Sequence, residues 1–218
     1  MHVPGPYRQP DSSWLVDLIR RNPLALLVTN GDVEPYATHL PIIAAPLPAA
    51  EWPPELAGST LVGHMNRVNQ HWRSLRAAMP AVLVFTGPNG YVSPQVYGYE
   101  PAAPTWNYTA VHVHGTVEPI ESRDEALEVV RATARTFEQD FGAGWSQSGS
   151  IDYFRRILPG VGAFRFLVSH AEGMFKLSQE QRPEVRSQVR ESFAGSDRCQ
   201  HRAAAELMAR WSEQHEDR

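Results

Sequence analysis

Short runs of apolar residues, separated by residues typical of turns, recur along most of the chain and predict β-strands. In chain order, the predicted strands are 24–29, 36–43, 60–65, 81–86, 107–120 and 161–168. Helical spacing of apolar residues is confined to 14–21, 69–78, 123–137, 151–157 and 203–211. Because these helices do not alternate regularly with the strands, a doubly wound sheet is not expected. The pattern predicts a mainly antiparallel β arrangement with peripheral helices, an α+β fold built as a barrel or a sandwich.

Turn residues and changes in composition divide the chain further. Residues 30–32 (Asn-Gly-Asp) predict a hairpin turn, and residues 87–90 (Gly-Pro-Asn-Gly) predict a second turn. Residues 46–58 are rich in Pro and Ala and are expected to form a surface loop. No linker interrupts the chain before about residue 180. We therefore expect one domain at residues 1–182, followed by a polar tail at 183–218 that is either helical or disordered.

Composition excludes several classes of function. The net charge of −4 gives no sign of a strongly basic face, so a nucleic-acid partner is not expected. Cys199 is the single cysteine, which excludes a disulfide within the chain and fits a reducing, cytoplasmic environment. No segment approaches the roughly 20 apolar residues that span a bilayer, so a membrane location is not expected. Phosphate-loop, Gly-x-Ser-x-Gly and His-Glu-x-x-His motifs are missing from the sequence. The candidate chemistry therefore lies in histidines and aromatic residues.

His64 stands at the end of a predicted apolar strand, beside a loop and the start of a predicted helix. An imidazole at such a position can face a pocket and ligate heme iron, while its other nitrogen bonds a backbone carbonyl. The alternative is a histidine that is satisfied by the backbone at a strand terminus. The sequence alone leaves both interpretations open.

Three further histidines lie within predicted strands. His39 shares a strand face with Ala37, and the alternative to a functional role is a half-buried histidine that bonds across the sheet. His112 and His114 share one strand face because side chains alternate along a strand. Their spacing suits zinc, but no further ligand is apparent nearby, so an exposed or interface face is expected rather than a structural metal site.

The densest polar and aromatic cluster is Trp106-Asn107-Tyr108. Trp106 and Tyr108 can flank a flat ring, and Asn107 and Tyr108 can hydrogen-bond its edges. The alternative is ordinary core packing. Arg67 and Arg73 can bind a phosphate or a propionate in bidentate fashion, and the alternative for each is a surface arginine.

Taken in order, five of these segments resemble the PaiB-like family. They are residues 37–41, Gly63-His64 with Asn69 and Trp72, residues 85–93, residues 104–115 and residues 176–179. The resemblance covers roughly residues 1–182 and implies an FMN-binding-type split β-barrel, usually a homodimer with cofactor pockets at the subunit interface. Family members are often described as negative transcriptional regulators, but the sequence shows no helix-turn-helix and no basic stripe.

One branch of that family, the piperazate synthases, is similar to this chain in size and motif order and uses heme b rather than flavin. This resemblance implies an enzyme of natural-product (antibiotic) biosynthesis that closes the amino acid N5-hydroxyornithine into piperazate, forming an N–N bond with loss of water. His64 would then be the axial ligand of the iron, and Tyr108 or His39 would be the catalytic base. The residues expected to hold the cofactor or the substrate are Arg67, Asn69, Trp72, Trp106 and Asn107.

The chain departs from the family pattern at one place. Many relatives carry Asn-Pro-Gln-Trp after the histidine, whereas this chain has Asn69-Gln70-His71-Trp72. The altered segment puts a simple transfer of the regulator function in doubt. Two alternatives stay open beside the heme enzyme: an FMN-binding oxidoreductase and a PaiB-like negative transcriptional regulator.

Overall fold

The computed structural model describes residues 1–45 and 50–215 and divides the chain into two compact units. The barrel unit comprises Ile19–Phe85 and His112–Ala171. The hairpin unit comprises Met1–Leu18, Thr86–Val111 and the chain from Glu172 onward. Strands β4, β5 and β6 contribute residues to both units, and each unit is described separately below.

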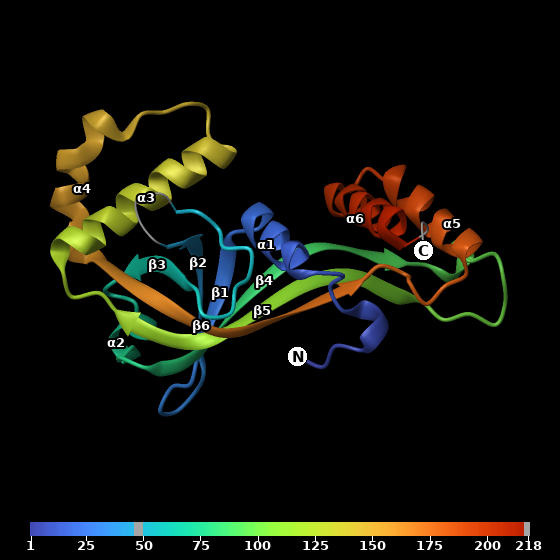
Figure 1. Cartoon of the computed structure of the whole chain (residues 1–218), viewed down its shortest axis with the longest axis horizontal. Helices are drawn as coiled ribbons and strands as arrows, with labels where there is room; N and C mark the ends of the chain where they lie inside the picture. Colours follow the sequence, from blue (N-terminus) through green and yellow to red (C-terminus); the bar gives the residue numbers. More distant parts are fainter. Residues whose placement is uncertain (46–49, 216–218) are drawn as a thin grey trace. The chain divides into compact units, whose positions relative to one another are not determined.

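Six strands form a closed barrel in the order β1-β2-β3-β6-β5-β4 (Figure 1). Their bounds are β1 Leu24–Thr29, β2 Tyr36–Ala44, β3 Thr60–Asn66, β4 Met79–Val92, β5 Thr105–Pro119 and β6 Val161–Lys176. The pairs β1–β2, β1–β4, β2–β3 and β3–β6 are antiparallel. Buried and partly exposed residues alternate along β1 and β4, as expected when one face of a strand fills the barrel. The predicted antiparallel barrel with peripheral helices is confirmed.

Five of the six α-helices in the described ranges lie where the sequence predicts them, with some differences in length, and the sixth lies in the segment expected to be either helical or disordered. They are α1 Ser12–Arg21, α2 Gln70–Ser74, α3 Arg123–Phe141, α4 Ile151–Ile157, α5 Pro183–Ala194 and α6 Cys199–His215. Helix α2 is shorter than the predicted 69–78, because the backbone is already extended at Leu75. No helix in the described ranges is long and apolar enough to cross a membrane.

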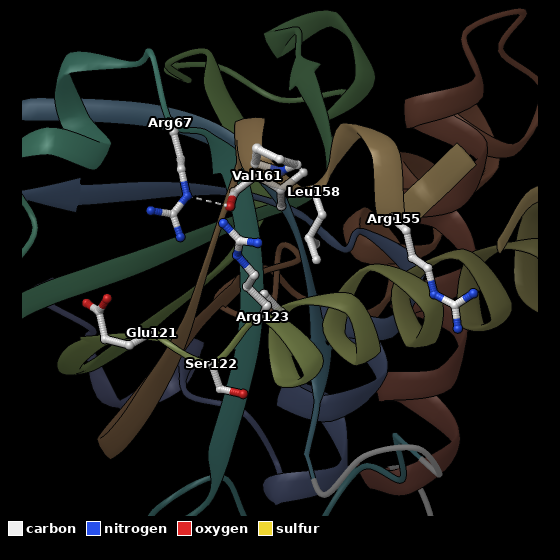
Figure 2. A pocket seen from close by; sticks show the side chains of 9 residues that line it. Arg67, Glu121, Ser122, Arg123, Arg155, Leu158 and Val161 are labelled. Atoms are coloured by element: carbon white, nitrogen blue, oxygen red, sulfur yellow. Dashed lines mark hydrogen bonds between the residues drawn. The ribbon is translucent and has the colours of Figure 1, made fainter. Parts of the chain in front are cut away.

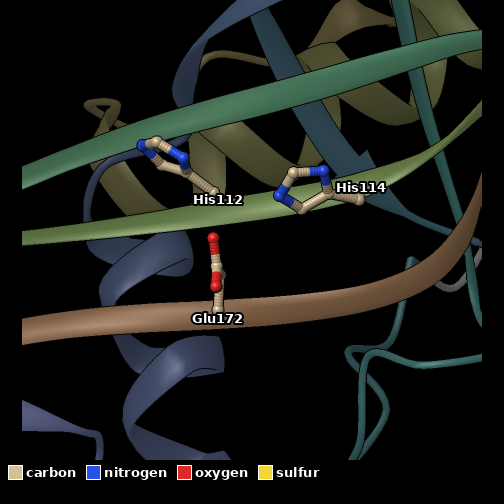
Figure 3. A group of neighbouring side chains, drawn as sticks. All are labelled: His112, His114 and Glu172. Carbon is tan, nitrogen blue, oxygen red and sulfur yellow. The ribbon is translucent and has the colours of Figure 1, made fainter. Parts of the chain in front are cut away.

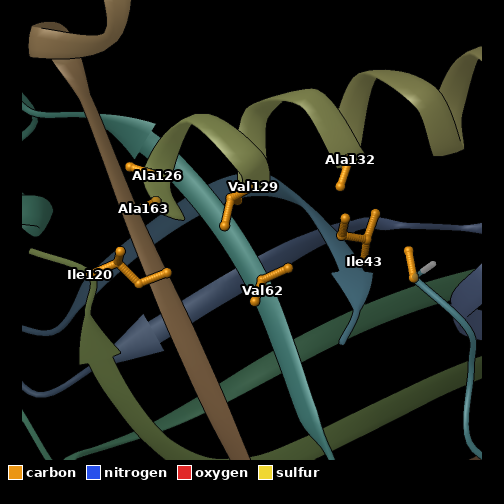
Figure 4. Close-up of a cluster of buried hydrophobic side chains, with 8 residues drawn as sticks. Ile43, Val62, Ile120, Ala126, Val129, Ala132 and Ala163 are labelled. Atoms are coloured by element: carbon orange, nitrogen blue, oxygen red, sulfur yellow. The ribbon is translucent and has the colours of Figure 1, made fainter. Parts of the chain in front are cut away.

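Helix α3 provides the main helical cover of the barrel unit. Ser122 caps its first turn by accepting a hydrogen bond from the Glu125 N–H. The buried face of the helix packs against β2, β3 and β6 in one apolar cluster (Figure 4), which includes Ile43, Val62, Ile120, Ala126, Val129, Ala132 and Ala163. Small alanines on the helix allow it to approach the sheet closely.

The turn predicted at residues 87–90 is wrong, because β4 continues through it to Val92. A Cβ on Gly87 would meet Thr109 Oγ1 at 2.4 Å, and a Cβ on Gly90 would meet the Phe193 ring at 2.6 Å. The carbonyl of Pro88 accepts a hydrogen bond from the Thr109 hydroxyl at 3.1 Å. The glycines therefore serve close packing inside the hairpin unit rather than a change of chain direction.

In the hairpin unit, the segment after residue 182 forms helices α5 and α6 rather than an irregular tail. Helix α6 also anchors α1: the Arg210 guanidinium lies 4.3 Å from the centroid of the Trp14 ring and pairs with Asp17 at 2.8 Å. The unit therefore groups this segment with Met1–Leu18. Of the predicted surface loop at 46–58, residues 46–49 lie outside the described residues.

Candidate functional site

The barrel unit places His64 on the outer face of β3. His64 lies opposite Ala163 of β6 and shares its strand face with Val62, and both neighbours belong to the cluster beneath α3. Burial lowers the pKa of His64, because desolvation disfavours the charged imidazolium. Its Nδ1 atom is buried and has no hydrogen-bond partner in the described part of the chain. A neutral imidazole with an unused nitrogen is the form that ligates a metal.

The environment of Nδ1 bears on both interpretations of His64. Each expects a ring nitrogen to hydrogen-bond the backbone, and Nδ1 makes no such bond in the described part of the chain. An unpaired buried polar atom costs about 1–3 kcal/mol in the folded protein. A ligand that accepts a hydrogen bond from this nitrogen, or a metal that the nitrogen coordinates, would offset that cost.

Arg67 and Trp72 form a fixed pair close to the end of β3. The Arg67 Nε–H donates to the Val161 carbonyl at 2.8 Å, and the guanidinium lies 5.3 Å from the centroid of the Trp72 ring. The indole packs on Gly162, where a Cβ would meet it at 2.3 Å. Arg67 also lines a cavity of about 260 Å³, and His64 is not among the residues that line it (Figure 2). The structure thus brings Arg67 and Trp72 together but gives His64 a separate environment.

Asn69 and His71 hold the start of α2 against the barrel. The Asn69 side chain accepts from the His71 N–H at 3.0 Å and donates to Thr38 Oγ1 at 3.3 Å. The imidazole of His71 is only 1% exposed, and it lies 2.8 Å from Thr38 Oγ1 and 3.0 Å from Thr29 Oγ1. It also stacks on the Tyr36 ring at 5.4 Å. The amide of Asn69, predicted to bind a cofactor, is engaged in capping, and that prediction stays untested.

Both ring nitrogens of His71 lie within hydrogen-bond distance of a threonine hydroxyl, which can donate or accept. Burial lowers the pKa of His71, which favours the neutral imidazole, so one ring nitrogen donates and the other accepts. The sequence shows that residues 69–72 differ from the family pattern, but it does not predict the structural role of His71. Thr29 and Thr38, on two predicted strands, are the hydrogen-bond partners that a prediction of this role would have needed.

Three other histidines of the barrel unit, His39, His112 and His114, are exposed or partly exposed on their strands. His39 is exposed on β2, opposite Leu26 of β1. His112 and His114 project from the same strand, β5, as Figure 3 shows, and their ring centroids are 6.4 Å apart. The shared face predicted for them is confirmed. His114 also stacks in parallel on His170 at 4.4 Å, a contact that the sequence did not indicate.

The hairpin unit separates the members of the predicted aromatic cluster. Trp106 is 53% exposed and contacts Tyr91 edge to face at 5.8 Å, while Tyr108 is half-buried two residues along the same face. Asn107 points to the opposite face because side chains alternate, and it is 0% exposed. Its Nδ2 donates to Ser178 Oγ at 2.8 Å. The structure therefore keeps the two aromatics on one face and removes Asn107 from it.

Comparison with known proteins identifies the family. The model of the family described as "Putative FMN-binding domain" matches residues 1–170. The chain is 26% identical to Protease synthase and sporulation protein PAI 2 of Bacillus subtilis (strain 168) over 210 residues, which are 95% of this chain and 96% of that protein.

Solved structures share the fold. The FAD and heme binding protein from Mycobacterium smegmatis matches with a TM-score of 0.56 at 17% identity, over 87% of this chain and 80% of that one. The flavocytochrome Anf3 from Azotobacter vinelandii matches with a TM-score of 0.53 at 13% identity, over 83% of this chain and 75% of that one. At such identities the likeness shows the fold alone. The chain therefore belongs to the "Putative FMN-binding domain" family and is a PaiB-like split barrel.

Proposed function

We propose that the protein is a heme-dependent enzyme that forms an N–N bond by dehydrative cyclisation of N5-hydroxyornithine to piperazate. The observation that carries this proposal is the buried Nδ1 of His64, which has no partner among the described residues. A neutral imidazole is one of the side-chain groups that ligate heme iron, and the lowered pKa of His64 favours that form. This donor chemistry supports heme b as the cofactor of the proposed enzyme.

Relatives of the same fold support a heme site. One solved neighbour is described as a FAD and heme binding protein, and another as a flavocytochrome. Both retain the barrel over three quarters or more of their length. We choose heme over flavin for this chain because a neutral imidazole such as that of His64 can ligate iron, which a flavin does not contain.

The chain's own residues would hold the reactants in place. When bound, the heme would supply a Lewis-acidic iron that makes the hydroxyl of an N–OH group a better leaving group. His64 would be the protein ligand of that iron. Arg67, which is fixed by Val161 and Trp72, would bind a heme propionate or the substrate carboxylate.

The reaction balances without an external oxidant or reductant. The α-amine nitrogen attacks the side-chain nitrogen, the N–N bond forms as the N–O bond breaks, and the departing hydroxyl leaves as water with one amine proton. A base must accept that proton, and Tyr108, the exposed His39 and a water molecule are the candidates. Holding the two nitrogens of one flexible substrate close together supplies much of the acceleration.

We also propose that the protein is a homodimer and that the second copy of the chain completes the cofactor pocket of the proposed enzyme. Leu26 pairs with Val84, and Val28 pairs with Val82, on the outer face of β1 and β4. All four side chains are partly exposed, which is unusual for a continuous apolar face of a barrel. Size-exclusion chromatography with light scattering should give a homodimer, and Val84→Lys should shift it to a monomer.

The visible spectrum and a turnover assay test the enzyme together. The purified protein should show a Soret band, and incubation with N5-hydroxyornithine should give a product lighter by one water. A flavin spectrum, or a heme protein with no loss of water from the substrate, would contradict the proposal. An N5-acetylated substrate analogue without the N–OH group serves as the control.

A flavin enzyme is the second candidate, because the matching family is named for FMN binding. It predicts bound yellow cofactor that is released on denaturation and identified by its fluorescence. A negative transcriptional regulator, the role that the family resemblance implies, would instead shift a specific DNA fragment in a salt-dependent way.

A further inference from the structure

A cavity of about 260 Å³ lies in the barrel unit between the end of β3, the start of α3 and the segment that joins α4 to β6. Three arginines line it, Arg67, Arg123 and Arg155, together with one carboxylate, Glu121 (Figure 2). Its volume is close to the lower end of the range for small-molecule sites, roughly 300–1,000 Å³. The cavity is therefore of a size for a small ligand.

The charges around the cavity do not balance. Arg155 pairs with Asp152 at 2.9 Å, on its own helix. Within the described residues, neither Arg67 nor Arg123 has a carboxylate within ion-pair distance, although Glu121 lines the same cavity. Figure 2 shows the Arg67 and Arg123 side chains extending toward Val161 from opposite sides. Two like charges that share a cavity repel each other, and a bound anion would reverse the sign of that interaction.

Two further features favour an anion. The Arg67 guanidinium is held by the Val161 carbonyl and the Trp72 ring, so it is already positioned before binding. The 19-residue helix α3 also begins at the cavity, with Ser122 at its cap, and directs the positive end of its dipole there. Glu125 in the first turn forms an ion pair with Arg165, which engages its charge elsewhere.

We propose that this cavity binds the phosphate group of a small molecule through Arg67 and Arg123. The two guanidinium groups come from different segments and approach from different directions, which suits a tetrahedral oxyanion better than a single planar carboxylate. The proposal goes beyond the heme enzyme and does not depend on His64. It assigns Arg67 to a phosphate held jointly with Arg123, in place of the propionate or carboxylate that the heme enzyme would give to Arg67.

Titration with inorganic phosphate at constant ionic strength tests the site. We expect the amide resonances at the start of α3 to shift and saturate in NMR spectra of the wild-type protein, and Arg123→Gln to weaken binding about tenfold or more. Arg156→Gln is the matched control, because Arg156 lies on α4 over the Tyr153 ring and does not line the cavity. This control should bind phosphate as the wild type does.

Several outcomes would overturn the proposal. They are no saturable shift with phosphate, equal weakening by Arg156→Gln, or acetate binding as tightly as phosphate. Arg123→Gln should keep the Soret band if heme binds, so a failure of the heme proposal and a failure of this one are distinguishable. Unchanged thermal unfolding of Arg123→Gln without phosphate confirms that the variant is folded.

Discussion

Two histidines of the barrel unit, the partly exposed His64 and the buried His71, show how imidazoles with lowered pKa values can differ in their chemistry. Burial lowers the pKa of both imidazoles. His71 has each ring nitrogen within hydrogen-bond distance of a threonine hydroxyl, whereas Nδ1 of His64 has no partner in the described ranges. An imidazole with both ring nitrogens hydrogen-bonded stabilises the fold around it. An imidazole with one nitrogen left without a partner keeps a lone pair or an N–H for a ligand. The hydrogen bonds to both ring nitrogens therefore distinguish a structural histidine from a candidate ligand.

Truncating each histidine should give the largest difference in stability. His71→Ala should lower the free energy of unfolding by about 2–4 kcal/mol, because it leaves a cavity and the unpaired hydroxyls of Thr29 and Thr38. His64→Ala in the heme-free protein should change it by about 1 kcal/mol or less, since it also removes an unsatisfied atom. Urea unfolding followed by circular dichroism measures both. Equal losses would contradict the distinction.

A substitution that disturbs the packing around Trp72 should lower the free energy of unfolding nearly as much as His71→Ala does. Gly162→Ala should cost about 1–3 kcal/mol, because the added Cβ would lie 2.3 Å from the indole. Gly149→Ala is the matched control in the same unit, where a Cβ meets nothing within 4 Å. It should change stability by less than about 0.5 kcal/mol. If both variants unfold at the same urea concentration, the α2 segment is not tightly packed on β6.

A smaller effect should appear in the pH dependence of stability. The folded-state pKa values of His64 and His71 are lowered, so the unfolded chain, with a histidine pKa near 6.5, binds more protons in acid. Stability should therefore fall as the pH drops below about 6.5, by at most about 1.4 kcal/mol per pH unit for each group. His71→Gln should reduce this slope even though it is less stable overall. A slope that is unchanged in both His64→Gln and His71→Gln would place the titration elsewhere.

The sequence predicts the strands of the barrel well because their signal is local. The apolar segments at 24–29 and 36–43 become strands β1 and β2, whose bounds match the predicted ranges to within one residue. The turn expected at 87–90 fails for a tertiary reason, since Gly87 and Gly90 make room for side chains distant in sequence, Thr109 and Phe193. Composition cannot distinguish a glycine that turns the chain from one that admits a neighbour.

The candidate site is less predictable than the fold. The partners of His71 are 42 and 33 residues away, so no local pattern announces them. The face of Asn107 follows from strand alternation, but its engagement with Ser178 does not. The choice between a ligand and a structural role for His64 depends on neighbours that only the fold supplies.

A heme titration of three proteins tests the central claim most directly. The wild type and His71→Gln should each bind one heme per chain and give the same Soret maximum, because both keep the His64 imidazole. His64→Ala should lose that band or shift it to that of unligated heme while keeping the wild-type circular dichroism spectrum. Full retention of the wild-type heme spectrum by His64→Ala would show that this histidine is not the iron ligand.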